Sequence, residues 1–168
     1  EEINYRRFFS VNDLICLRTE QEEVFLHTHQ LIHRLVADGR FTGLRVDHVD
    51  GLYNPAFYLR RLRTANPDTY LVVEKILQPG ESLPPFFPVE GTTGYDVMRY
   101  LDGVFVERAH ERALSRTYGR FSQERRSFRE LCSDKKKLIV DEEMGGDIDN
   151  LAAALQRISR RYRYGSDI

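Results

Sequence analysis

The fold of this chain can be predicted from one stretch of sequence, Gly43-Leu44-Arg45-Val46-Asp47-His48-Val49-Asp50-Gly51. Hydrophobic and charged residues alternate from Leu44 to Asp47, which predicts a short strand, and Asp50-Gly51 is typical of a turn. Side chains alternate faces along a strand, so Arg45 and Asp47 should share one face. We expect this strand to be buried, and the arginine would then hold the aspartate ionised as a nucleophile or an electrostatic stabiliser.

A second strand is predicted from Thr69 to Glu74, where β-branched and aromatic residues lead to a carboxylate. Between the two strands, Asn54-Pro55 is a typical start of a helix. Strand, helix and strand in this order predict a parallel pair with a right-handed crossover. Asp47 and Glu74 would then both lie at the carboxyl ends of their strands, and if the strands are neighbours, their backbones are about 4.8 Å apart. That spacing is close to the roughly 5–5.5 Å between the carboxylates of retaining glycosidases.

These motifs resemble those of the α-amylase superfamily of glycoside hydrolases. Gly-Leu-Arg-Val-Asp-His at 43–48 and Val-Val-Glu-Lys at 72–75 are similar to its nucleophile strand and its acid/base strand. Three further stretches, at 3–9, 47–51 and 91–96, narrow the resemblance to the trehalose-forming members. The resemblance covers about the first hundred positions and continues more loosely through the remainder.

The resemblance implies an enzyme that acts on a maltooligosaccharide substrate. It would convert the reducing-end α-1,4 linkage into an α,α-1,1 (trehalose) linkage by intramolecular transglucosylation, with a retaining double displacement. Asp47 would be the nucleophile, Arg45 would keep it charged, and Glu74 would be the general acid and then the general base. From the residues alone, the arginine and aspartate could equally form a structural ion pair without a catalytic role.

Four residues are candidate substrate contacts. The resemblance implies three of them, His48, Lys75 and Tyr95, and Phe9 is the fourth because a loop could present it to a ligand. The alternative for Phe9 is a hydrophobic anchor beneath the loop. For Tyr95, the residues alone slightly favour a turn before a helix capped by Asp96, whereas the resemblance implies a sugar-contacting loop.

The predicted fold class is α/β, with a partial (β/α)8 barrel of about two to three parallel strands and their helices, and an α-helical insertion subdomain. Residues 1–19 are predicted to be a loop leading into the barrel. Residues 20–103 would form the partial barrel, with a helix at 20–38 that Gly39 ends and a third strand around 88–92. Residues 104–168 would form three helices, at about 114–121, at 128–139 and from a cap at Asp149 to Tyr162.

Composition and charge argue against several classes of function. The net charge of −1 gives no reason to expect nucleic acid or membrane as a partner. Cys16 and Cys132 form no disulfide framework and no signal peptide begins the chain, which favours the cytoplasm. His29 and His33 have helical ligand spacing but lack a third ligand, so we expect surface histidines, no metal and no other cofactor. No Gly-x-Gly-x-x-Gly follows a strand, which argues against a dinucleotide site.

The superfamily barrel has eight strands, and the strands that should carry the third essential carboxylate are not found in this sequence. We therefore interpret the chain as an internal part of a longer enzyme that is inactive by itself. Without inner cover, Arg45, Val72 and the carboxylates should be exposed, and the free strand edges favour self-association. The alternatives are another amylase-type hydrolase or transglycosidase, and a non-catalytic structural or binding module.

Overall fold

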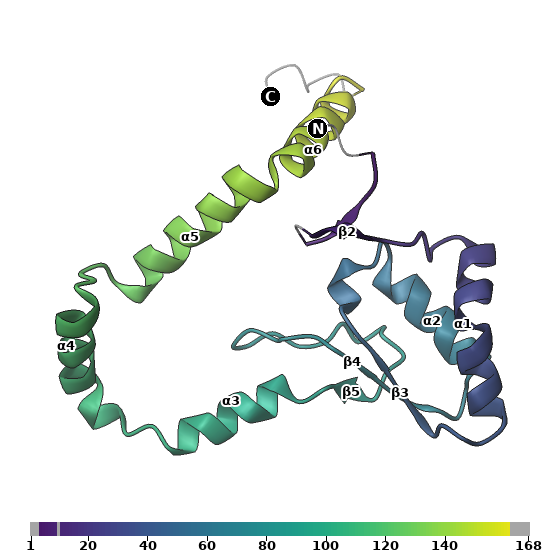
Figure 1. Cartoon of the computed structure of the whole chain (residues 1–168), viewed down its shortest axis with the longest axis horizontal. Helices are drawn as coiled ribbons and strands as arrows, with labels where there is room; N and C mark the ends of the chain where they lie inside the picture. Colours follow the sequence, from purple (N-terminus) through teal and green to yellow (C-terminus); the bar gives the residue numbers. More distant parts are fainter. Residues whose placement is uncertain (1–3, 10, 162–168) are drawn as a thin grey trace. The chain divides into compact units, whose positions relative to one another are not determined.

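The computed structural model describes residues 4–9 and 11–161 and has a mixed α/β structure (Figure 1). The chain divides into two compact units, Glu1–Glu107 and Arg108–Ile168. Ile3 of the first family motif and Tyr162 of the last predicted helix lie outside the described residues. Within the described ranges, every helix is too short or too polar to cross a lipid bilayer.

The first unit begins with an antiparallel hairpin of β1 (Arg7–Phe8) and β2 (Val11–Ile15). The prediction of a loop was therefore wrong for this part of 1–19. All residues of β2 are exposed, so no face had to be hydrophobic and no alternating pattern marked the strand. The hairpin is held by the backbone N–H of Cys16, which donates to the Arg6 carbonyl at 2.9 Å, and by the Tyr5 hydroxyl on the Asn12 carbonyl at 2.8 Å.

Two predicted helices, α1 (Glu22–Ala37) and α2 (Pro55–Ala65), are confirmed. Gly39 follows α1 with a φ of +67°, a left-handed conformation in which glycine pays no steric penalty. Asn54 caps α2 as predicted, because its side-chain oxygen accepts from the backbone N–H of Phe57 at 3.0 Å.

The predicted parallel sheet is present, with β4 (Tyr70–Val73) between β3 (Gly43–Val46) and β5 (Gly91–Thr92). The register pairs Leu44 with Leu71 and Val46 with Val73. These four side chains therefore share one face of the sheet, and the alternate residues of the same strands share the other. The fold thus separates a hydrophobic face from the face on which Arg45 lies.

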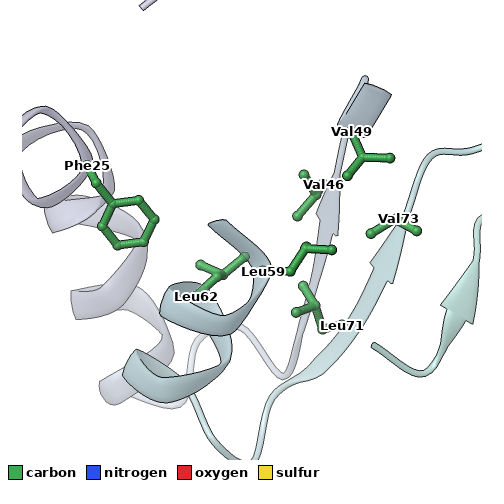
Figure 2. Close-up of a cluster of buried hydrophobic side chains, with 7 residues drawn as sticks. All are labelled: Phe25, Val46, Val49, Leu59, Leu62, Leu71 and Val73. Carbon is green, nitrogen blue, oxygen red and sulfur yellow. The ribbon is translucent and has the colours of Figure 1, made fainter. Parts of the chain in front are cut away.

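The hydrophobic face is covered by α2 (Figure 2). Leu59 and Leu62 of α2 lie between the strands and Phe25 of α1, and all three side chains are buried. The remaining buried hydrophobic residues of this core are Val46, Val49, Leu71 and Val73.

The opposite face is open. The exposure expected without inner cover is confirmed for Arg45 and Asp47, whereas Val72 and Glu74 are only partly exposed. The Arg45 side chain is 49% exposed and that of Asp47 is 64% exposed. The interpretation of β3 as a buried strand is therefore wrong for this face, because the described residues cover the strand on one side only.

Arg63, near the end of α2, fixes the loop that leads into β5. Its guanidinium donates to the carbonyls of Pro88 at 3.0 Å and Thr69 at 2.6 Å, and to both carboxylate oxygens of Glu90 at 2.8 Å. Glu90 in turn accepts the backbone N–H of Leu71 at 2.6 Å. The side chain thus joins the end of one helix to the start of β4 and to the residues before β5, which the sequence did not indicate.

The first unit ends with α3 (Tyr95–Val104), and the second unit contains α4 (Glu111–Ser122), α5 (Phe128–Glu143) and α6 (Gly145–Ser159). The three helices predicted for 104–168 are therefore present. The predicted start of the last one was wrong: α6 begins at Gly145 instead of Asp149, and only Met144 separates it from α5. Ser127 and Glu130 form a capping box that accounts for the sharp start of α5.

The prediction of surface histidines was wrong for His29, which is 6% exposed in the contact between α1 and α2. Its Nδ1 lies 2.8 Å from the Phe25 carbonyl, which can only accept, so Nδ1 carries the proton. Its Nε2 then accepts from the Tyr58 hydroxyl at 2.6 Å. Burial lowers the pKa of His29, and the Phe25 carbonyl opposes this, while the nearby His33 and Arg61 lower the pKa further.

The buried His29 makes the stability of the chain sensitive to acid. Because the pKa of His29 is lower in the folded chain than in the unfolded chain, the unfolded chain binds the proton more readily. The free energy of unfolding should therefore be highest above the ordinary pKa of histidine, about 6.5, and should decrease as the pH falls below it. His29→Gln should flatten this pH dependence between pH 5 and pH 7, measured by urea denaturation.

The matched control is His27→Gln, since His27 is exposed on the same helix. This variant should keep the pH dependence of the unaltered chain. A slope that His29→Gln leaves unchanged would contradict the assignment.

Candidate active site

The two candidate carboxylates directly follow neighbouring parallel strands. Asp47 comes after β3 and Glu74 after β4, and the register places Val46 beside Val73. The ladder continues by one bond, since the backbone N–H of Glu74 donates to the Val46 carbonyl at 2.8 Å. Alternation along the strands puts both carboxylates on the open face with Arg45.

Arg45 joins the two carboxylates. One of its terminal nitrogens lies 2.7 Å from Asp47 Oδ1 and 3.5 Å from Glu74 Oε1. Because Asp47 Oδ1 and Glu74 Oε1 contact the same nitrogen, the distance between them cannot exceed the sum of these two distances. They are therefore closer than the roughly 6.5–9.5 Å that inverting glycosidases need for a water molecule, and their spacing suits a retaining pair.

His48 provides the second link to Glu74. Its backbone N–H donates to Glu74 Oε2 at 2.8 Å. This geometry depends on a left-handed backbone at His48, with φ +49° and ψ +47°. Such a conformation is uncommon for residues with a side chain, although histidine is among the types that adopt it more often.

The tip of the β1–β2 hairpin lies against His48. The ring centroids of Phe8 and Phe9 are 5.0 and 5.1 Å from that of the imidazole, and 4.5 Å from each other. Phe9 is 71% exposed, whereas Phe8 is partly buried. Phe9 therefore has the accessibility that a substrate contact needs, and Phe8 has more of the burial that an anchor needs.

Lys75 is held by acidic side chains of two loops. Its Nζ lies 3.0 and 3.1 Å from the Asp50 oxygens and 3.7 Å from Glu81 Oε1. The hydrogen bond that Lys75 donates to the Asp50 carboxylate is the main reason that the pKa of Lys75 is raised. The ammonium thus connects the turn after β3 with the loop after β4. The sequence indicated Asp50 only as a turn residue, and nothing in it identified Glu81 as a partner.

Lys75→Met should loosen the loop at 77–88 without unfolding the chain. The variant loses ion pairs that each contribute about 0–1 kcal/mol at a surface, and it leaves Asp50 and Glu81 close together without a cation. We expect faster proteolytic cleavage in this loop and a free energy of unfolding lowered by about 1 kcal/mol or less. Lys136→Met, at an exposed position of α5, is the control, and equal cleavage rates in both variants would contradict the role.

Tyr95 begins α3 and is 37% exposed. In the described residues it makes no hydrogen bond or ring contact with Arg45, Asp47 or Glu74. The cap of α3 is Gly94, with φ +99°, and Asp96 lies in the first turn, where it accepts from the Thr92 hydroxyl at 2.6 Å. The predicted bend before a helix is therefore present, but Gly94 caps this helix and the prediction of Asp96 as the cap was wrong.

Other ligand sites are less well defined. Among the described residues, no three or more His, Cys, Asp and Glu side chains gather in a way that could hold a metal ion. An open hollow of about 370 Å³ lies at the opposite end of the strands from the carboxylates, and its lining includes Thr42 and Thr69, which precede β3 and β4. The carboxylate pair therefore remains the candidate site.

Adjacent parallel strands that end in paired carboxylates, with a crossover helix between them, are the arrangement of the amylase class of carbohydrate-active proteins that the motifs resemble. No family model matches the chain. A protein of Mycobacterium tuberculosis (strain H37Rv) that bears the name maltooligosyl trehalose synthase is 46% identical over 112 residues. These residues are 66% of this chain and 15% of that protein.

Solved structures agree with this match. The maltooligosyltrehalose synthase from Arthrobacter ramosus is 40% identical with a TM-score of 0.85, over 91% of this chain and 20% of that one. A glycosyltrehalose synthase is 42% identical with a TM-score of 0.82, over 90% of this chain and 21% of that one. The chain is thus related to the maltooligosyl trehalose synthases, as the motifs indicated, and spans about a seventh of the length of its curated relatives.

Proposed function

We propose that this chain supplies the nucleophile and the acid/base of an enzyme that converts the reducing end of a maltooligosaccharide into a trehalose unit. In this proposal β3, β4 and β5 are adjacent strands of a (β/α)8 barrel, and α2 is one of its outer helices. The active-site face of such a barrel lies at the carboxyl ends of its strands, where Asp47 and Glu74 are found.

The observation that carries the proposal is the single guanidinium shared by two strand-end carboxylates. Their spacing suits a double displacement, which needs one carboxylate as nucleophile and the other as proton donor and acceptor. The similarity to maltooligosyl trehalose synthases over most of the chain supports the choice of substrate.

In the first displacement, an Asp47 oxygen attacks C1 of the glucose that precedes the reducing end. The C1–O4 bond breaks, and Glu74 gives its proton to O4 of the departing glucose. The sugar chain is then held as a glycosyl ester on Asp47, and Glu74 is left as a carboxylate.

In the second displacement, the departing glucose stays bound and turns so that its anomeric hydroxyl faces C1. Glu74 takes the proton of this hydroxyl while its oxygen attacks C1, and the Asp47 ester is released. Two inversions retain the α configuration and give an α,α-1,1 bond. Because water would compete for the ester, the exposed Asp47 needs cover from other parts of the enzyme.

A chimera tests this function. The segment of the Arthrobacter ramosus enzyme that matches this chain would be replaced by the chain, and the product incubated with maltopentaose. We expect reducing ends to disappear without release of glucose, because both anomeric carbons of a trehalose unit are bonded. An increase in reducing ends would instead indicate a hydrolase, and an unchanged amount with no new product would favour a binding module.

A further inference from the structure

Gly51 lies directly against the imidazole of His48. A Cβ added at Gly51 would overlap Cδ2 and Nε2 of the ring, so a side chain and the observed ring cannot occupy this place together. The backbone of Gly51 does not need glycine for its own conformation, since its φ lies outside the left-handed range. The close approach of the ring is therefore what requires glycine here.

The imidazole also contacts two phenylalanine rings. The rings of Phe8 and Phe9 lie 5.0 and 5.1 Å from it, in edge and tilted arrangements. The Gly51 backbone N–H also donates to the His48 carbonyl at 2.9 Å, which closes the short turn. The imidazole thus contacts both this turn and the tip of the hairpin, while the backbone N–H of the same residue donates to Glu74.

We propose that Gly51 is a positioning residue, which sets the place of the His48 imidazole and, through this ring, joins the Phe8–Phe9 tip to the carboxylate pair. Any side chain at 51 pushes the ring out of its place, either by a change of rotamer or by a shift of the left-handed backbone. Both movements change the contacts of the imidazole with the two phenylalanines. This proposal extends the proposed function. Its test by activity rests on that function, whereas its test by stability does not.

The first test needs no activity. Gly51→Ala, His48→Ala and the double variant would be compared in this chain by urea denaturation. Gly51→Ala should lower the denaturation midpoint in the unaltered chain, but it should have little effect when His48 is already alanine, because the obstructing ring is absent. Gly103→Ala is the control, since a Cβ there meets no atom within 4 Å.

The position of the His48 ring can also be followed in the same chain by the NMR resonances of its ring protons. They should be displaced by the currents of the phenylalanine rings in the unaltered chain and in the Gly103→Ala variant. In Gly51→Ala they should shift from these positions, because the ring lies differently against the phenylalanines. Equal effects of Gly51→Ala in both backgrounds, or ring resonances that do not move, would overturn the proposal.

The second test uses the chimera. Gly51→Ala should lower kcat/KM roughly ten- to a hundred-fold, the range in which a displaced contact reduces the rate. In the His48→Ala background the same change should lower it no further, whereas a merely structural weakening would add its own loss. If the chimera is inactive while the stability cycle behaves as expected, the proposed function fails and the positioning role stands.

Discussion

Asp47→Asn is expected to abolish the formation of trehalose-ended product while the chimera still binds maltooligosaccharide. The amide has the shape of the carboxylate but cannot form the glycosyl ester, so the first displacement has no nucleophile. The loss in kcat should be at least about 10⁴-fold, as for other enzymes that lose a nucleophile or its partner. Product would be measured by chromatography, and binding by calorimetry with maltopentaose.

The control is Asp68→Asn, an exposed aspartate just before β4. This position lies at the opposite end of the strand from Glu74, so the substitution should leave turnover unchanged. If the Asp47→Asn chimera keeps turning over the natural substrate, the assignment of the nucleophile is wrong.

Glu74→Gln is expected to lower kcat by about 10² to 10⁴-fold with maltooligosaccharides, since general acid–base catalysis contributes this much. The amide cannot give a proton to the departing glucose or take one from its anomeric hydroxyl. It also removes the charge that Arg45 faces at 3.5 Å and that the His48 backbone N–H faces at 2.8 Å. Rates would be measured with maltopentaose and with maltosyl fluoride.

The fluoride separates the chemical role of Glu74 from a positioning role. Fluoride leaves without a proton, so Glu74→Gln should reduce formation of the glycosyl ester from maltosyl fluoride far less than it reduces turnover of maltopentaose. Glu23→Gln, at an exposed position of α1, is the control for a loss of negative charge. An equal reduction with both substrates would mean that Glu74 does not supply the proton.

The sequence was most informative where hydrophobic periodicity and turn chemistry coincided. The strands that end before Asp47 and Glu74, the helix between them and its cap at Asn54 were all predicted, because each has a local signal. The parallel direction of the two strands followed from topology, since parallel strands need a crossover connection and the helix at 55–65 provides one.

Features that depend on distant partners were not predicted. The second strand of the β1–β2 hairpin is exposed along its whole length and so lacks an alternating pattern. His29 was expected at the surface because its burial depends on Tyr58, 29 positions away. Lys75 was expected to face the sugar, and its contacts with Asp50 and Glu81 could not be read from either neighbourhood. In each case the decisive contact comes from tertiary structure, on which local propensity has no bearing.

Both carboxylates belong to one uninterrupted piece of chain, since β3, α2 and β4 follow one another between Gly43 and Val73. A single strand–helix–strand unit needs about 30 residues, and closing so short a loop carries a small entropic penalty. The contacts that place the two carboxylates therefore have a low contact order, which favours rapid formation. During synthesis, the pair can assemble once β4 and Glu74 have left the ribosome, before the helices that follow have emerged from it.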